Sequence, residues 1–305
     1  MVKKDQESTE KDTTVSGFAE APPRVSERQR FQRVFFSRKI VMFGMVILVA
    51  LVFTAIFANL LAPYDPYKPD MSSSLLPPNR EHLLGTDIFG RDTLSRLIYG
   101  SRTALAVGFI SVGIASVIGI VAGITAGYFG GITNIIIMRA IDTLMPFPMI
   151  VLALIVAGML GGGIHNVIIA LSIATIPPYT RVTHGLALSV KETDYILAQR
   201  SMGASHLRIM MNHILPNAFP PIIVLMTMML GSLILAEAGL SFLGIGIEPP
   251  GAAWGAMVND GYKYLQDHPI LSFAPGLAIM LVVFAFNMVG DGLRDALDPR
   301  LRGLL

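Results

Sequence analysis

Long apolar runs alternate with short polar segments through most of this chain. Each run holds about 20 residues, which is the length of helix that crosses the ~30 Å hydrocarbon core of a bilayer. The pattern therefore predicts an all-α membrane protein with six transmembrane helices. The predicted spans are residues 40–62, 103–126, 134–157, 164–186, 217–236 and 269–290.

The composition supports a membrane protein. Of the 305 residues, 53% are hydrophobic and 14% are charged, and the mean hydropathy is +0.61. A soluble domain of this size would carry a charged fraction near a quarter. The chain contains no cysteine, which excludes disulfides, a thiolate nucleophile and a Cys-ligated metal.

The positions of the basic residues predict the orientation. Six spans place both termini on one side, and a cytosolic N-terminus puts most of the 23 Lys and Arg residues in cytosolic segments. The positive-inside rule therefore favours cytosolic termini. The same orientation places the polar segment 191–217 in the cytosol.

The chain divides into four predicted regions. Residues 1–38 form a cytosolic, partly disordered tail, and residues 39–102 form the first transmembrane helix with an external loop. Residues 103–298 hold the other five spans, and residues 299–305 form a cytosolic C-terminal tail. Arg and Phe are mixed in residues 26–39, so this stretch fits a headgroup surface and a plain juxtamembrane segment equally well.

Segment 191–217 is the longest polar interruption between two apolar spans. Ser189 and Glu192 have capping-box spacing, so we expect a short helix from there toward Met202, followed by a turn at Gly203. A second short helix should end at Leu215-Pro216. The apolar stripe of that helix would be Leu207, Met210, Met211 and Ile214. The pattern fits both a docking piece for a soluble partner and an ordinary cytosolic loop.

Two further patterns predict local structure. Asp92 or Thr93 can cap a short, soluble surface helix that ends at Gly100 in the external loop. Small residues recur every fourth position in the second span, which would let another helix backbone approach closely. These residues are Ser111, Ala115, Gly119, Gly123 and Gly127.

Charged residues near the spans have structural interpretations. Arg139 and Asp142 are three residues apart, so we expect them to pair with each other at the cytosolic boundary rather than form an ion-coupling site. Glu237 is expected to contact solvent or neighbouring backbone near the outer end of span five. Arg294 should lie between Asp291 and Asp298. The sequence alone leaves open whether Glu237 or Asp142 contacts substrate.

Sequence signatures of catalysis are missing. There is no phosphate-binding Gly-x4-Gly-Lys-Ser/Thr loop and no pair of histidines at metal-binding spacing. We therefore expect no catalytic residue, bound cofactor or metal. An intramembrane hydrolase built on Gly239-x-Ser241 would need a facing histidine, and a secondary transporter driven by an ion gradient would need charges in mid-span.

One motif in segment 191–217 resembles a known family. Ala198-x4-Gly203-x11-Leu215-Pro216 resembles the EAA loop of ABC importer permeases, although Leu197, Gln199 and His213 depart from its pattern. The resemblance implies a type I ABC importer transmembrane domain with cytosolic coupling helices. The residues that would couple to the ATPase are Tyr195, Ala198, Arg200, Gly203, Ala204, Leu215 and Pro216.

Other motifs narrow the resemblance to the C-type permeases of the dipeptide/oligopeptide/nickel class. They are Gly85-Thr86-Asp87, Gly90-Arg91-Asp92, Leu240-Ser241-Phe242-Leu243-Gly244 with Trp254-Gly255, and the run from Phe286 to Pro299. The resemblance implies a bacterial or archaeal plasma membrane protein and no nucleic-acid partner. It implies a homologous second permease, two ATP-binding subunits that hold the ATP, and an extracytoplasmic solute-binding protein. Dipeptides, oligopeptides, glutathione and a nickel chelate all fit, and an ion-gradient-driven secondary transporter is the alternative.

Overall fold

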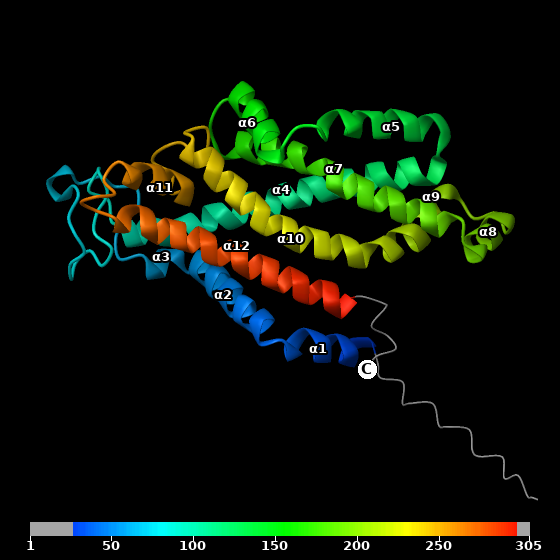
Figure 1. Cartoon of the computed structure of the whole chain (residues 1–305), viewed down its shortest axis with the longest axis horizontal. Coiled ribbons are helices and arrows are strands. Elements are labelled where there is room, and N and C mark those ends of the chain that lie inside the picture. The colour runs from blue at the N-terminus through cyan, green and yellow to red at the C-terminus, as the bar shows by residue number, and fades with distance from the viewer. Residues whose placement is uncertain (1–26, 298–305) are drawn as a thin grey trace, which may run out of the picture.

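The computed structural model describes residues 27–297, and its regular elements are helices (Figure 1). Residues 1–26 and 299–305 of the predicted tails, and Asp298 as a partner of Arg294, lie outside these residues, whereas residues 27–37 of the predicted N-terminal tail form a helix. The α-helices are α1 Glu27–Ser37, α2 Lys39–Ile56, α3 Ala58–Leu61, α4 Thr93–Phe129, α5 Gly131–Leu144, α6 Met149–Leu160, α7 Ile164–Lys191, α8 Asp194–Ser201, α9 His206–Ile209, α10 Leu215–Phe242, α11 Trp254–Tyr262 and α12 Ile270–Leu297. A 3-10 turn, η1, spans Met71–Ser73, and a π-helical turn, η2, spans Met210–Ile214.

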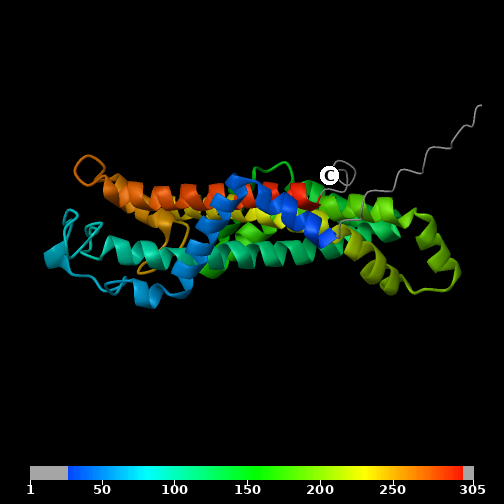
Figure 2. The same cartoon turned by 90° about the horizontal axis from the view of Figure 1, so that it is seen from below.

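The long helices lie side by side in an elongated bundle (Figures 1 and 2). Four helices in the described chain are long and apolar enough to cross a membrane, or up to five if the bent pair α5 and α6 counts as one span. The prediction of six such helices is thus confirmed only in part. The helix α7 falls outside this group because its second half carries polar side chains such as Thr180, Arg181 and His184.

The predicted span 134–157 is not one continuous helix. The chain forms α5 and α6 instead, which are bent by 89° relative to each other. Pro146 and Pro148 lie in the short link between them. Proline lacks an amide hydrogen and clashes with the preceding turn, so two prolines this close interrupt the helix.

The first predicted span is also divided. α2 ends at Ile56 and α3 begins at Ala58, so the carbonyl groups of the last turn of α2 lose their helical partners. Arg102 in α4 donates hydrogen bonds to two of them, on Ala55 and Ile56. The guanidinium group therefore satisfies a helix end that would otherwise stay unpaired.

The helix α4 does not end at Gly100, contrary to the prediction. It runs without a break for 37 residues from its Asp92 cap to Phe129. Gly100 packs against the indole ring of Trp254, where an added Cβ would lie 2.5 Å from the ring. The glycine allows close packing rather than helix termination.

The row of small residues in α4 packs against α7, as predicted. An added Cβ on Gly119 would lie 2.5 Å from the Cβ of Tyr179, and one on Gly127 would lie 2.7 Å from the Cβ of Ala187. The hydroxyl of Thr183 donates a 3.1 Å hydrogen bond to the carbonyl of Gly119. Residue numbers rise together along both helices, so α4 and α7 are parallel and in close backbone contact.

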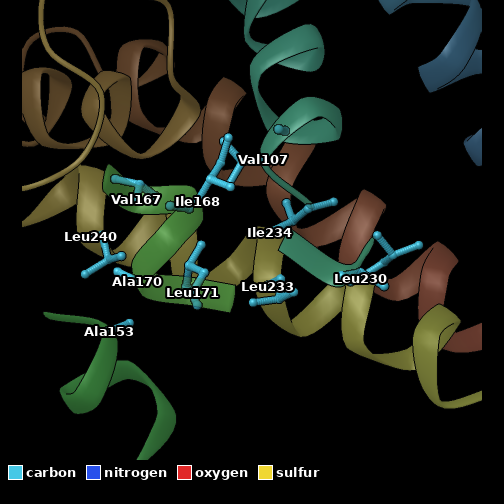
Figure 3. Close-up of a cluster of buried hydrophobic side chains, with 14 of the residues drawn as sticks. Val107, Ala153, Val167, Ile168, Ala170, Leu171, Leu230, Leu233, Ile234 and Leu240 are labelled. Carbon is cyan, nitrogen blue, oxygen red and sulfur yellow. The ribbon is translucent and has the colours of Figure 1, made fainter. Parts of the chain in front are cut away.

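The main apolar core lies where α4, α7 and α10 meet (Figure 3). Val107, Leu171 and Leu233 are fully buried there. A smaller cluster joins α1 to α12, with Phe35 buried against Val289 and an ion pair of 2.5 Å between Arg38 and Asp295. This packing holds the first described helix against the last one.

Candidate functional site

Segment 191–217, called the docking segment below, forms a projection at one end of the bundle (Figure 1). It contains α8, α9 and η2. The expected start at Ser189 and Glu192 is wrong, because α7 continues to Lys191 and the next helix begins at Asp194. Ala187 near the end of α7 is fully buried, and this packing keeps the last turn of α7 helical.

The turn between α8 and α9 forms at Gly203, as predicted. Its φ of +81° lies in the left-handed region that favours glycine. The amide of Gly203 donates to the carbonyl of Arg200 at 2.9 Å, and the amide of Ala204 donates to that of Gln199 at 3.0 Å. Ser205 then caps α9 by accepting from the amide of Arg208. These bonds close α8 and start α9 within a few residues.

Leu215-Pro216 does not stop the second helix, contrary to the prediction. Residues from His206 to Phe242 form one helical path, with Pro216 in the first turn of α10. The amide of Leu215 donates to the carbonyl of Met210, which is a π-helical bond five residues apart. The wider turn accommodates the proline, which has no amide hydrogen to donate.

The expected stripe of four apolar residues is divided between two faces. Ile214 is fully buried, whereas Leu207 and Met211 are 66% and 52% exposed. The π-helical turn shifts residues off the usual 3.6-residue spacing, so the stripe does not stay on one side. The exposed large apolar side chains of the docking segment are those of Tyr195, Leu197, Met202, Leu207 and Met211.

The seven predicted coupling residues have different surroundings. Tyr195, Ala198, Arg200, Gly203 and Pro216 are exposed, and Ala204 and Leu215 are half-buried against the apolar cluster beneath the segment. The amide of Asn217 donates to the hydroxyl of Tyr195 at 3.3 Å. This contact connects α8 to the start of α10.

Sequence reasoning missed Tyr128 and His206, which contact each other beneath this segment. The hydroxyl of Tyr128, at the end of α4, lies 2.8 Å from Nδ1 of His206. The guanidinium of Arg200 lies over the same ring, 5.0 Å from its centroid. The partners are 78 positions apart, and no local pattern connects them.

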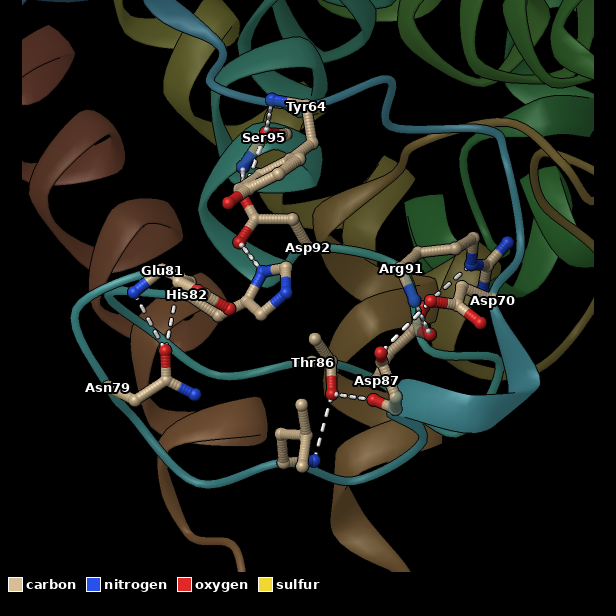
Figure 4. A network of polar contacts seen from close by, with 12 residues as sticks. Tyr64, Asp70, Asn79, Glu81, His82, Thr86, Asp87, Arg91, Asp92 and Ser95 are labelled. Atoms are coloured by element: carbon tan, nitrogen blue, oxygen red, sulfur yellow. Dashed lines mark hydrogen bonds and ion pairs between the residues drawn. The ribbon is translucent and has the colours of Figure 1, made fainter.

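At the opposite end, residues 62–92 and 244–268 fold over the start of α4 and α12; we call them the cap. Asp92 caps α4 by accepting from the amide of Ser95 at 2.8 Å, as predicted, and contacts Nδ1 of His82 at 2.9 Å (Figure 4). The expected soluble surface helix is wrong, because Arg91 and Asp92 are 5% and 3% exposed. The cap loops cover them.

Arg96 joins both parts of the cap. Its guanidinium donates to the carbonyls of Pro66, Pro250 and Gly251 at 3.1, 3.4 and 3.4 Å. Its Nε lies 3.4 Å from the carboxylate of Asp87. Burial raises the pKa of the nearby Asp260 carboxyl, and the positive charge of Arg96 opposes this shift. Arg96 therefore adds positive charge near the carboxyl groups of Asp87 and Asp260 while it binds two loops.

Replacing Arg96 by lysine is expected to loosen the cap, because one ammonium group cannot reach all three carbonyls in a planar arrangement. Loss of these hydrogen bonds should increase the cleavage rate of residues 62–92 in limited proteolysis by about ten-fold. Arg80→Lys is the control, since Arg80 lies exposed in the same loop. Equal cleavage of both variants would contradict the assigned role.

Two other predicted contacts are corrected. Asp142 pairs with Arg181 of α7 at 2.7 Å rather than with Arg139, because α5 and α7 pack together. Glu237 does not contact solvent: it is 2% exposed and accepts a 2.7 Å hydrogen bond from the hydroxyl of Ser241. Ser241 is therefore paired with a carboxylate rather than with a histidine. Residues 27–297 hold no group of three metal-binding side chains.

The helix arrangement has a counterpart among solved structures. The structure resembles that of the MetNI methionine ABC transporter in inward-facing conformations, with a TM-score of 0.53 and 21% sequence identity over 67% of this chain and 96% of that chain. The similarity shows that the two chains share a fold.

Sequence comparison identifies the family. Residues 119–303 match the family of binding-protein-dependent transport system inner membrane components, and residues 26–78 match the N-terminal TM domain of oligopeptide transport permease C. The chain belongs to this permease family. It is 40% identical over 264 residues to the dipeptide transport system permease protein DppC of Alkalihalophilus pseudofirmus, covering 87% of each chain.

A second relative is named for a different substrate. The nickel transport system permease protein NikC of Escherichia coli is 39% identical over 265 residues, which cover 87% of this chain and 96% of that protein. The predicted resemblance to permeases of the dipeptide and nickel class is confirmed. Nothing supports the alternative of a secondary transporter driven by an ion gradient.

Proposed function

We propose that this chain is one of two permease subunits of an ATP-driven importer and forms half of the pathway for a small solute. The observation that carries the proposal is the docking segment. Two short helices meet at Gly203 and present exposed apolar side chains at the end of the bundle away from the cap. Exposed apolar residues gathered on one projection are typical of a protein interaction site.

In this proposal, the docking segment binds an ATP-binding subunit. Tyr195, Ala198 and Arg200 are exposed on α8 and contact that partner, while Gly203 and Ala204 form the turn. Leu215 and Pro216 lead the chain into α10. A homologous permease supplies the other half of the pathway, with the second ATP-binding subunit beneath it. ATP is held by these partner subunits rather than by this chain.

The same arrangement supports an orientation in the membrane. The start of α1 and the end of α12 lie toward the docking end of the bundle (Figure 1). Together with the distribution of Lys and Arg, this supports cytosolic termini in a bacterial or archaeal plasma membrane. The cap then faces the extracytoplasmic side, where a solute-binding protein delivers its cargo.

The mechanism is alternating access. Closure of the two ATP-binding subunits around ATP displaces the docking segment, and the attached helices rock between inward-open and outward-open arrangements. The relatives named for dipeptide, peptide and nickel transport support a peptide or a metal chelate as the solute. The binding protein is expected to select among these solutes.

The first test is a pull-down of the tagged full-length chain from mild detergent, followed by mass spectrometry. We expect a second permease and one or two ATP-binding subunits to copurify. Uptake should stop when the ATP-binding subunits are removed and persist when the ion gradient is dissipated. A chain that purifies alone, with uptake that follows the ion gradient, would contradict the proposal.

A further inference from the structure

Tyr128 lies where α4 meets the docking segment. The side chain is 4% exposed and contacts both helices that flank the Gly203 turn. Its hydroxyl contacts His206 of α9, and its ring lies beneath Arg200 of α8. One residue of a long helix thus touches both halves of the proposed coupling site.

The other contacts between α4 and the docking segment are aromatic or apolar, and one of them places the ring of Phe129 5.7 Å from that of His206, centroid to centroid. Ile124 of α4 packs with Ile196, Ile209 and Ile214 in a buried cluster. Such contacts stabilise the packing of the segment against α4 but have little directional preference. Among residues 27–297, the hydroxyl of Tyr128 makes the one side-chain hydrogen bond between α4 and the docking segment. It fixes the position of α9 relative to the end of α4.

The structure of α4 allows it to pass a displacement along its length. Its 37 residues contain no proline, and at 1.5 Å per residue it is about 55 Å long. Prolines lie within α7, α10 and α12. Close packing of Gly119 and Gly127 against α7 prevents the two helices from sliding independently. The other end of α4 carries Arg96, which holds the cap.

We propose that Tyr128 is the positioning residue that transmits movement of the docking segment to α4, and through α4 to the cap. The inference rests on the proposed function, since it needs an ATP-binding subunit on the docking segment. Coupling between two sites is reciprocal. A loaded binding protein on the cap therefore favours closure of the ATP-binding subunits through the same contact, and hydrolysis follows that closure.

The test is Tyr128→Phe in the complete transporter, reconstituted in proteoliposomes. Phenylalanine keeps the ring beneath Arg200 and the apolar cluster, and removes only the hydroxyl. We expect normal copurification of the ATP-binding subunits and normal basal hydrolysis. Stimulation of hydrolysis by the solute-loaded binding protein should fall about five-fold, and the solute imported per ATP should fall with it.

Tyr179→Phe is the matched control. Tyr179 is fully buried in the neighbouring helix α7, and its hydroxyl has no hydrogen-bond partner. Removing that hydroxyl should leave stimulation unchanged. His206→Phe should reproduce the Tyr128→Phe effect, and the double variant should be no worse than either single variant because the two residues share one contact.

Three results would overturn the inference. Unchanged stimulation in Tyr128→Phe would show that the hydroxyl does not transmit movement. Loss of the ATP-binding subunits from that variant would make Tyr128 a support for docking instead. If the unmodified chain binds no ATP-binding subunit, the proposed function itself fails, and this inference fails with it.

Discussion

Replacing Gly203 by valine is expected to abolish transport and reduce copurification of the ATP-binding subunits, with membrane insertion intact. The φ of +81° at this position costs an L-residue about 1–2 kcal/mol, and a β-branched side chain is among the least tolerated. No atom lies within 4 Å of an added Cβ, so the effect comes from the backbone and not from a clash. Uptake assays and pull-downs measure both consequences.

Two other variants separate this cause from a general effect of valine. Gly185→Val places the same side chain in open space on α7, at a position with no left-handed backbone, and should keep uptake. Gly203→Asn should keep more activity than Gly203→Val, because asparagine adopts the left-handed conformation more readily. Normal uptake by Gly203→Val would refute the assignment of this turn.

Replacing Gly123 by valine is expected to disrupt the pairing of α4 and α7. An added Cβ would overlap the hydroxyl of Thr183 and the backbone carbonyl of Thr180. Because the second obstacle is backbone, the helices must separate, at a cost of about 3 kcal/mol. The melting temperature of the purified protein in detergent should fall by roughly 5–10 °C.

Gly113→Val is the control for this prediction. Gly113 lies on the same helix, and no atom lies within 4 Å of an added Cβ. Its melting temperature should stay within about a degree of that of the unmodified protein. An equal decrease in both variants would mean that valine weakens α4 itself, and that close approach to α7 matters little.

Local patterns predicted several features correctly. The apolar runs located α2, α4, α10 and α12, because a long apolar segment crosses a membrane whatever its neighbours are. The N-terminal capping of α4 by Asp92 and the turn at Gly203 also depend on nearby backbone alone. The small residues of α4 indicated a close helix contact, although they could not identify α7 as the partner.

Features decided by distant residues were not predictable in this way. Asp142 has Arg139 one turn away, yet it pairs with Arg181 because α7 lies beside α5. Arg96 resembles a soluble surface residue until the loops that cover it are known. Proline also interrupts a helix at one place in this chain and is tolerated within a helix at another. Pro146 lies in a break between helices, whereas Pro216 continues a helix through a π-helical turn.

The length of α4 has a consequence for its depth in the bilayer. A helix of about 55 Å exceeds the hydrocarbon thickness of about 30 Å, so it must extend beyond the hydrocarbon core. Arg96 is tied to loops at one end, and Tyr128 to polar side chains at the other. Sliding by one turn in either direction would pull one of these polar attachments toward lipid. Thickening or thinning of the surrounding bilayer should therefore bend the neighbouring helices before it shifts α4.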